Sequence, residues 1–269
     1  ELDRVVGWPA ADASLVFEGR VADHDSTYVT RLRRAGAVLV GQTTASEFGG
    51  LNVSVTRLNG VTRNPWDPTK TAGGSSAGSA AAVAGGLVAL ATGGDGGGSI
   101  RIPAGFCGLV GMKGTYGRVP RGPRTAVAPM TVVLGCLGRS VRDVARYYDV
   151  CAGYDTRDPN SLPTRVGWER DLGSHDLHGL RVVLAPTLGS AFVRAEVVEL
   201  VSEATEALAD AAGLKIVDTP VNLPEPSVEW AMSNMASLVN ELGDRYPECQ
   251  DQLTPEIAFG LMLATQTYD

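Results

Sequence analysis

Apolar positions along the chain follow two spacings, and each spacing predicts a different element. Short unbroken apolar runs bounded by glycine, proline or polar residues are typical of interior strands. They predict strands at 37–41, 87–92, 181–186 and 215–218. Apolar residues three or four positions apart are typical of helices that bury one face. They predict helices that begin after Asp25, after Ser76, near Pro103, at Ser140, near Val197, around Trp230 and from Pro255.

Strands and helices alternate along the chain, and this order decides the fold class. Such alternation favours an α/β protein. We therefore expect a mixed, largely parallel central β-sheet covered by helices on both faces. No internal repeat or low-complexity segment divides the 269 residues, so we expect a single α/β domain over 1–269.

Composition narrows the classes of partner. The net charge is −7 and no block of lysine or arginine occurs, so nucleic acid is not an expected partner. No apolar run is long enough to span a bilayer, and the first residues lack a secretory signal pattern. We expect a cytoplasmic protein without a membrane partner.

The cysteines form neither a metal site nor a disulfide pattern. They are widely spaced, without a C-x-x-C pair or a nearby histidine, and they are Cys107, Cys136, Cys151 and Cys249. We expect reduced, buried thiols and no metal. Cys107 lies nearest to the serines described next and could touch a substrate, although packing is its favoured role.

Two serines in glycine-rich turns are the strongest candidates for chemistry. Ser75 and Ser99 stand 24 residues apart, and Asp95 is the only charged residue between them. A buried helix and strand would carry the chain away and return Ser99 beside Ser75, with the two hydroxyls within hydrogen-bonding reach of each other. Because Ser99 follows the glycine run 96–98, several backbone amides can converge on one point without interference from Cβ atoms. A serine beside converging amides suits acyl transfer, in which the hydroxyl attacks a carbonyl and the amides hold the oxyanion.

Three other interpretations of these turns stay open. A glycine-rich turn can simply let a helix and a strand pack closely. A phosphate-binding loop is weakly supported, because the run lacks a G-K-[ST] ending and a G-x-G-x-x-G pattern. Residues 74–78 match the G-x-S-x-G nucleophile elbow with Ser76 at its centre, but that motif needs a strand directly before it. The preceding segment is polar and broken by proline, and the histidine would have to be His175 or His178 in a polar segment.

Residues 73–119 resemble the signature region of the amidase signature family. The stretch reads GGSSAGSAAAVAGGLVALATGGDGGGSIRIPAGFCGLVGMKGTYGRV, and the match is long and specific. Weaker similarity at 20–48, 139–153 and 176–186, with the helix that follows the last of these, extends the resemblance over most of 7–220. It implies the amidase signature fold, with the signature core at about 60–125 and the fold truncated at both ends.

The resemblance implies a hydrolase that cleaves a carboxylic amide with a Ser–cis-Ser–Lys triad. Ser99 would be the acylated nucleophile, and Ser75 the bridging serine after a cis peptide bond from Gly74. The implied oxyanion hole consists of the amides of Gly96, Gly97, Gly98 and Ser99. The implied partner is a small-molecule amide, and no metal or organic cofactor is implied.

Asp95 and Arg101 also match the family motif. Their positions on either side of Ser99 favour an ion pair that braces the serine loop over a direct part in the chemistry.

The family's relay lysine has no counterpart in this chain. No lysine precedes Lys70, and neither Lys70 nor Lys113 stands at the relay position. The chain is then either a fragment or part of a catalytically inactive relative, and a start at Glu1 instead of Met favours the fragment. We expect these 269 residues alone to be inactive and prone to aggregate, since a sheet cut short exposes strand edges.

Ile102 bears on the choice between two activities of the family. The glutaminase subunits of tRNA-dependent amidotransferases that resemble this chain usually have glutamine there, so Ile102 favours a stand-alone amidase. The glutaminase role stays as the alternative. The identity of the amide and a homo-oligomeric state are left open by the sequence.

Overall fold

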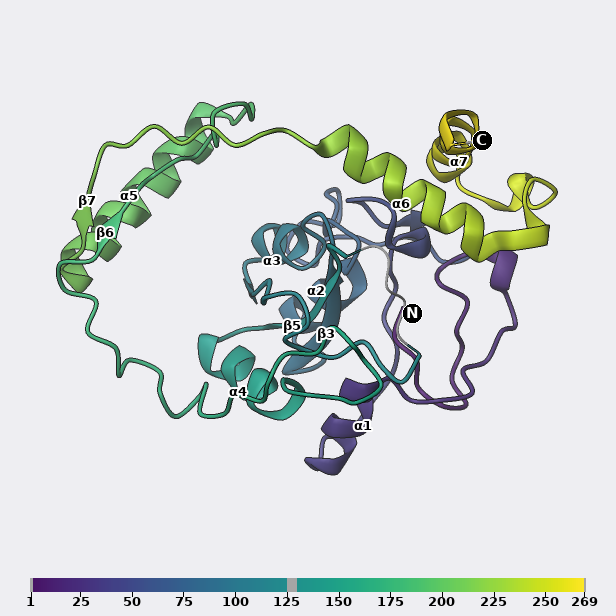
Figure 1. Ribbon diagram of the computed structural model, residues 1–269, viewed down its shortest axis with the longest axis horizontal. Coiled ribbons are helices and arrows are strands. Elements are labelled where there is room, and N and C mark those ends of the chain that lie inside the picture. The colour runs from purple at the N-terminus through teal and green to yellow at the C-terminus, as the bar shows by residue number, and fades with distance from the viewer. Residues whose placement is uncertain (1, 125–129, 269) are drawn as a thin grey trace. The chain divides into compact units, whose positions relative to one another are not determined.

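The chain forms two compact units, each with its own secondary structure. A computed structural model describes residues 2–124 and 130–268 (Figure 1). One unit is Glu1–Arg170 together with Ala231–Asp269, and the other is Asp171–Trp230. The organisation of 1–269 as a single domain stays a prediction.

The first unit contains most of the helices and strands. Its strands are β1 (Val55–Thr56), β2 (Gly60–Val61), β3 (Leu90–Asp95), β4 (Val110–Gly111) and β5 (Val133–Gly138). Its α-helices are α1 (Thr27–Arg34), α2 (Ala77–Ala84), α3 (Arg101–Cys107), α4 (Val141–Cys151), α6 (Ser227–Leu242, which begins at the end of the second unit) and α7 (Pro255–Tyr268). Short 3₁₀ helices lie at η1 (Leu15–Phe17), η2 (Glu47–Gly49), η3 (Gly243–Arg245) and η4 (Gln250–Gln252).

The main sheet has the strand order β3-β5-β4, and β5 is antiparallel to both neighbours. On the β3 side, Leu90 pairs with Gly138 and Asp95 pairs with Val133. The prediction of largely parallel pairing is therefore wrong for this sheet. β3 and β4 do run in the same direction, as expected of strands joined by a crossover helix, but β5 lies between them. The sequence pattern missed β5, because glycines interrupt its apolar run.

Helices cover both faces of this sheet, as predicted. Neighbouring residues on a strand point to opposite faces, and Cys136 and Leu137 on β5 belong to different buried clusters. Cys136 packs with residues of α1 and α4, such as Tyr148. Leu137 packs with residues of α2 and α3, such as Ala80 and Ala104. In Figure 1, α2 and α3 accordingly lie on one side of β3 and β5, and α4 lies on the other.

The predicted helices are all present among the described residues. Ser140 caps α4 as expected: its hydroxyl accepts a hydrogen bond from the Asp143 amide at 3.1 Å. α6 and α7 pack on each other and on the N-terminal segment, through Leu242, Ile257 and Phe17. Within the described ranges, no helix is both long and apolar enough to cross a bilayer.

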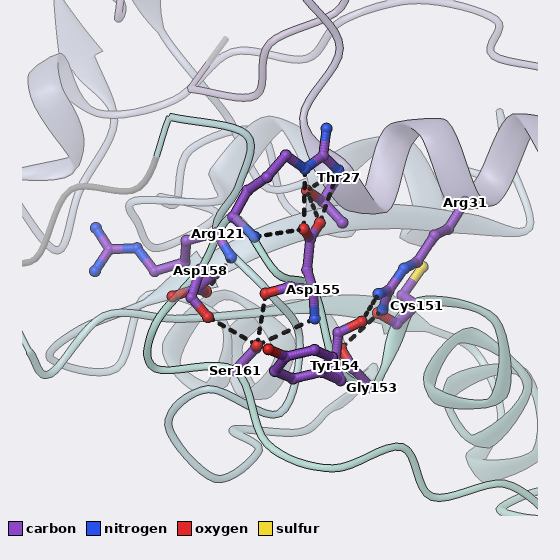
Figure 2. Close-up of polar contacts among 10 residues, drawn as sticks. Thr27, Arg31, Arg121, Cys151, Gly153, Tyr154, Asp155, Asp158 and Ser161 are labelled. Carbon is purple, nitrogen blue, oxygen red and sulfur yellow. Dashed lines mark hydrogen bonds and ion pairs between the residues drawn. The ribbon is translucent and has the colours of Figure 1, made fainter.

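The segment that leaves α4 is tied to α1 by polar contacts (Figure 2). The Arg31 guanidinium donates to the carbonyl oxygens of Cys151 at 2.7 Å and Tyr154 at 2.8 Å. Asp155 accepts a hydrogen bond from the Thr27 hydroxyl at 2.8 Å, at the first residue of α1. These contacts fix α1 beside α4, on the face of the sheet opposite α2 and α3.

The predicted strand at 37–41 is wrong. These residues are in no strand, and the side chains of Val38 and Val40 are 83% and 73% exposed. An apolar run becomes a strand only where another strand pairs with it and a second layer covers it. The strand predicted at 87–92 is present but begins three residues later, as β3.

The second unit is a strand–helix–strand element. β6 (Arg181–Val182) pairs in parallel with β7 (Lys215–Ile216), and α5 (Ala195–Ala212) connects them. Parallel pairing is thus observed here, over shorter strands than predicted. α5 is capped by Gly213, whose φ of +65° closes the helix in a left-handed turn. The apolar side of α5 is largely exposed, with Leu200 at 65%, and Ala209 is its buried residue.

Candidate active site

The Ser99 turn is built around a buried carboxylate. Asp95 ends β3 and is fully buried. Its two oxygens accept hydrogen bonds from the Arg101 guanidinium, from Nη2 and Nε at 2.9 Å each. They also accept from the backbone amides of Gly98 (2.8 Å), Ile100 (3.2 Å) and Arg101 (3.3 Å). The predicted ion pair that braces the serine loop is therefore confirmed.

Two opposing effects act on the Asp95 carboxyl. Burial disfavours the charged form and by itself would raise the pKa of Asp95. The hydrogen bonds and charge of Arg101, with the amides of Gly98 and Ile100, outweigh burial and hold that pKa below its ordinary value of 3.8. The hydrogen bond to Asp95 raises the pKa of Arg101 in turn. At neutral pH the turn is therefore closed by a charged pair.

The glycines before Ser99 have different surroundings. The Gly98 amide donates to Asp95, and Gly98 has a φ of +113° that favours glycine. A Cβ on Gly98 would also come within 2.7 Å of the Ile102 side chain. No hydrogen bond within the described residues uses the amides of Gly96, Gly97 or Ser99. Of the amides that the resemblance implies for an oxyanion hole, the Gly98 amide thus already has an acceptor inside the protein.

The Ser75 turn is held by hydroxyl and amide groups. The peptide bond from Gly74 to Ser75 is cis, as the resemblance implies. The Ser75 carbonyl oxygen accepts from the Ser46 amide at 3.2 Å and from the Ser54 hydroxyl at 3.3 Å. Position 74 has room only for glycine, because a Cβ there would lie 2.7 Å from the Val53 nitrogen. The segment 46–54 is therefore packed directly against this turn.

The two serine turns lie against each other, as the sequence analysis expected. The Ser76 amide donates to the Ser99 carbonyl oxygen at 3.2 Å. The Ser76 hydroxyl lies 3.4 Å from the Gly94 carbonyl oxygen, and a Cβ on Gly93 would come within 2.8 Å of it. Helix α2 thus approaches β3 so closely that glycine is required. Both Ser75 and Ser99 are buried. Among the described residues the turns are joined through the Ser76 amide, and the expected hydrogen bond between the two hydroxyls is not formed.

The first described residues also reach this site. Gly49 has a φ of +70°, and a Cβ built on it would lie 3.6 Å from Ser75 Oγ and 3.2 Å from Leu2 Cδ1. Leu2 and the Ser75 hydroxyl therefore both lie near Gly49. Ser46, Gly49 and Ser54 were not among the site residues expected from the sequence; Ser46 lies within the segment 20–48 of weaker family similarity, and Gly49 and Ser54 follow it.

Two lysines lie in the same unit as the serines. Lys113 donates to the Gly114 carbonyl oxygen at 3.1 Å, and Lys70 is exposed. Neither bonds to Ser75 or Ser99 within the described residues.

The nucleophile-elbow interpretation of residues 74–78 is not supported by the fold. The segment directly before Ser76 is not a strand, which that motif requires. Ser76 instead precedes α2 and faces β3.

The cysteines are free and buried, as predicted. Cys107 packs among apolar side chains of α2 and α3, and burial raises the pKa of its thiol. Within residues 2–124 and 130–268, no group of three or more His, Cys, Asp or Glu side chains is placed to hold a metal ion.

Comparison with known proteins agrees with the resemblance. A family model described as Amidase matches residues 2–252. A glutamyl-tRNA(Gln) amidotransferase subunit of Rhodopirellula baltica is 45% identical over 175 residues, which are 65% of this chain and 35% of that protein. The chain spans 35% to 49% of the length of such curated relatives.

Solved structures share the fold. The structure of 6-aminohexanoate cyclic dimer hydrolase matches with a TM-score of 0.89 and 30% identity, over 98% of this chain and 58% of that one. A bacterial aryl acylamidase of the amidase signature enzymes matches with a TM-score of 0.85 and 30% identity, over 97% and 56% of the two chains. The α/β amidase signature fold is thereby confirmed, and the chain belongs to the amidase signature family.

Proposed function

We propose that the protein hydrolyses a small-molecule carboxylic amide in the cytoplasm, through an acyl-enzyme formed on Ser99. The observation that carries this proposal is the juxtaposition of the two serine turns through the bond from the Ser76 amide to the Ser99 carbonyl. Ser75 follows a cis peptide bond and Ser99 follows the glycine run, in the arrangement that the family resemblance implies.

The proposed reaction is a proton relay that uses no metal or organic cofactor. Ser99 Oγ attacks the amide carbon, its proton passes to Ser75, and the Ser75 proton passes to a neutral lysine. The relay returns a proton to the leaving nitrogen, the C–N bond breaks, and amine or ammonia departs. Water then attacks the Ser99 ester by the same relay and frees the acid.

The oxyanion of the tetrahedral intermediate needs donors that are not already paired. The amides of Gly96, Gly97 and Ser99 are the candidates, because the Gly98 amide donates to Asp95. In our proposal Gly98 shapes the hole through its backbone conformation and its bond to Asp95. Loss of one such donor typically costs about 3 kcal/mol of transition-state stabilisation.

The relay lysine is proposed to come from outside these 269 residues. The position of Leu2 near Gly49, which itself lies near Ser75 Oγ, supports this. Lys70 and Lys113, the lysines of the first unit, make no contact within the described residues that would replace that lysine.

Covalent trapping on the full-length protein tests this function. A fluorophosphonate probe should label the peptide that contains Ser99, with loss of fluoride. Ser99→Ala should abolish labelling, and Ser75→Ala should slow it by about 100-fold or more, because the relay is broken. The matched control is Ser76→Ala, which should label within about threefold of wild type. Labelling that survives Ser99→Ala rules out the assignment.

The curated relatives favour a second candidate, the glutaminase component of a tRNA-dependent amidotransferase. The names of those relatives describe that enzyme, whereas Ile102 favours a stand-alone amidase. Ammonia release from glutamine, measured with and without a co-purified partner protein, separates the two. The glutaminase depends on its partner, whereas a stand-alone amidase turns over other amides without one. A catalytically inactive relative would show no labelling of Ser99.

A further inference from the structure

Glu47 is a fully buried carboxylate beside the Ser75 turn, and the proposed chemistry gives it no part. Its Oε1 accepts a hydrogen bond from the Ser14 hydroxyl at 2.7 Å. Its Oε2 accepts from the Thr254 hydroxyl at 2.7 Å and from the Thr254 amide at 2.8 Å. Ser14 precedes η1 and Thr254 precedes α7, so the carboxylate ties together segments far apart in the sequence.

The partners of Glu47 differ from those of an ordinary buried ion pair. Each is a neutral donor, and within the described residues no arginine or lysine bonds to this carboxylate. Thr254 stands at the N-terminus of α7, and the Ala258 amide donates back to the Thr254 carbonyl as the first turn of that helix. The positive end of the helix dipole there is a favourable neighbour for a carboxylate.

The backbone on both sides of Glu47 contacts the Ser75 turn. Ser46, directly before Glu47, donates its amide to the Ser75 carbonyl oxygen. Gly49, two residues after it, lies beside Ser75 Oγ. The segment 46–50 is itself a turn. It is closed by hydrogen bonds from the Gly49 amide to the Ser46 carbonyl and from the Gly50 amide to the Glu47 carbonyl, each at 2.9 Å.

The Ser46 side chain continues this network toward Ser54. Ser46 Oγ lies 2.8 Å from the Leu51 carbonyl oxygen, 2.6 Å from that of Val53 and 3.1 Å from Ser54 Oγ. Ser54 in turn reaches the Ser75 carbonyl. The turn at 46–50, which contacts Ser75, is thus fixed at its Ser46 end by hydroxyl groups and in its middle by the Glu47 carboxylate.

We propose that Glu47 is a positioning residue for Ser75, which it holds through Ser46 and Gly49 while it is itself anchored by Ser14 and Thr254. The inference rests on the proposed function, in which Ser75 passes the proton between Ser99 and the base. Proton transfer needs heavy atoms about 2.6–3.2 Å apart, and a misplacement of about 1 Å costs roughly 100-fold in rate. A displaced turn 46–50 would therefore slow the chemical step and leave probe binding almost unchanged.

The test compares isosteric variants of the full-length protein in two measurements. Glu47→Gln places an NH₂ group, which is itself a donor, against the donors of Ser14 or Thr254. Thr254→Val removes the Thr254 hydroxyl, a donor to Glu47 that is remote from Ser75 and Ser99 in sequence. The first measurement is fluorophosphonate labelling of Ser99, separated into the maximal rate constant and the half-saturating concentration. The second is hydrogen–deuterium exchange of the Ser46 amide.

The matched control is Asp158→Asn, at another buried carboxylate. Asp158 accepts hydrogen bonds from the Arg121 amide (Figure 2) and from the Asn160 amide. Within the described residues its side chain bonds to neither serine turn. The substitution therefore disturbs a buried carboxylate of similar environment without touching the segment 46–50.

The expected results separate positioning from general destabilisation. Glu47→Gln should lower the maximal labelling rate constant by about 10- to 100-fold, with half-saturation changed less than about threefold. Thr254→Val should lower it by a smaller factor, and both should speed exchange at Ser46. Asp158→Asn should change neither the maximal labelling rate constant nor the exchange at Ser46, even where it lowers the melting temperature as much as Glu47→Gln does.

Other results overturn the inference or the proposed function separately. If Glu47→Gln labels at the wild-type rate, or if Asp158→Asn slows labelling equally, Glu47 does not position Ser75 for the reaction. If wild-type Ser99 is not labelled at all, the proposed function fails, and the exchange measurement still decides whether Glu47 fixes the Ser46 contact to Ser75.

Discussion

The two serine turns lie against each other but are held in different ways. The Ser99 turn closes on a charged pair within six residues, in which Asp95 takes hydrogen bonds from Arg101 and from the amides between them. The Ser75 turn depends on neutral donors from elsewhere in the chain, Ser46 and Ser54. The Ser99 turn is thus fixed by a charged pair within the turn, and the Ser75 turn by neutral hydrogen bonds from a segment more than 20 residues away in the sequence.

This difference suggests a division of roles. A nucleophile that must be surrounded by fixed amides gains from a rigid, locally closed loop, because preorganised donors need no rearrangement during the reaction. A bridging serine must exchange protons with groups on both sides, so its placement relative to other segments matters most. Each turn is therefore vulnerable to a different kind of substitution.

The largest expected effect is the loss of the carboxylate from the Ser99 turn. Asp95→Ala leaves the amides of Gly98 and Ile100 without an acceptor and Arg101 without its counter-charge. We expect a loss of about 3 kcal/mol in the free energy of unfolding, a value that already allows for the half-exposed Arg101 side chain. Urea unfolding of the full-length protein measures it. Arg101→Ala should cost less, because Asp95 keeps its backbone donors; an equal or greater loss there would contradict this account.

A smaller effect is expected from pH. The pKa of Asp95 is lower in the folded protein than its ordinary value of 3.8, so the folded state binds this proton less readily than the unfolded state does. The stabilisation by the ionised carboxylate is therefore complete above the ordinary value and is lost as the pH falls through the lower, folded value.

Acid unfolding monitored by circular dichroism checks the sign. Wild type should lose stability more steeply than Asp95→Asn below about pH 4, and the two should have parallel profiles between about pH 5 and 7. Parallel profiles through the acid range would show that Asp95 makes no such contribution.

The smallest expected effect is at the Ser75 turn. Ser54→Ala removes the hydroxyl that lies 3.3 Å from the Ser75 carbonyl and leaves the Ser46 amide in place. Since a neutral hydrogen bond contributes about 0.5–1.5 kcal/mol, labelling of Ser99 should slow by about two- to twelvefold. Ser54→Thr keeps the hydroxyl and should recover part of the rate. A Ser54→Ala protein as slow as Glu47→Gln would mean that the hydroxyl groups, and not the carboxylate, hold the turn.

The sequence predicts the local half of this site better than the distant half. Asp95, Ser99 and Arg101 lie within seven positions, so their arrangement can be predicted from the glycine run and the motif. The bond between Glu47 and Thr254 spans 207 residues, and no local pattern indicates it.

The strand order of the main sheet was also missed because it depends on contacts between segments far apart in the sequence. The helices follow from their own periodicity, but the place of β5 between β3 and β4 depends on pairing between distant segments. The apolar run at 37–41 shows the converse, since a strand-like pattern without a partner strand does not form one.

The insertion of β5 between β3 and β4 has a consequence for the growing polypeptide. β3 pairs with β5 within the described residues, so it has no strand to join until Val133 and the residues after it have left the ribosome. The Asp95 end of β3, which anchors the nucleophile loop, pairs with Val133 at the start of that late segment. A ribosome-bound chain stalled before residue 133 would thus carry both serines and yet lack the strand that holds the second of them in register.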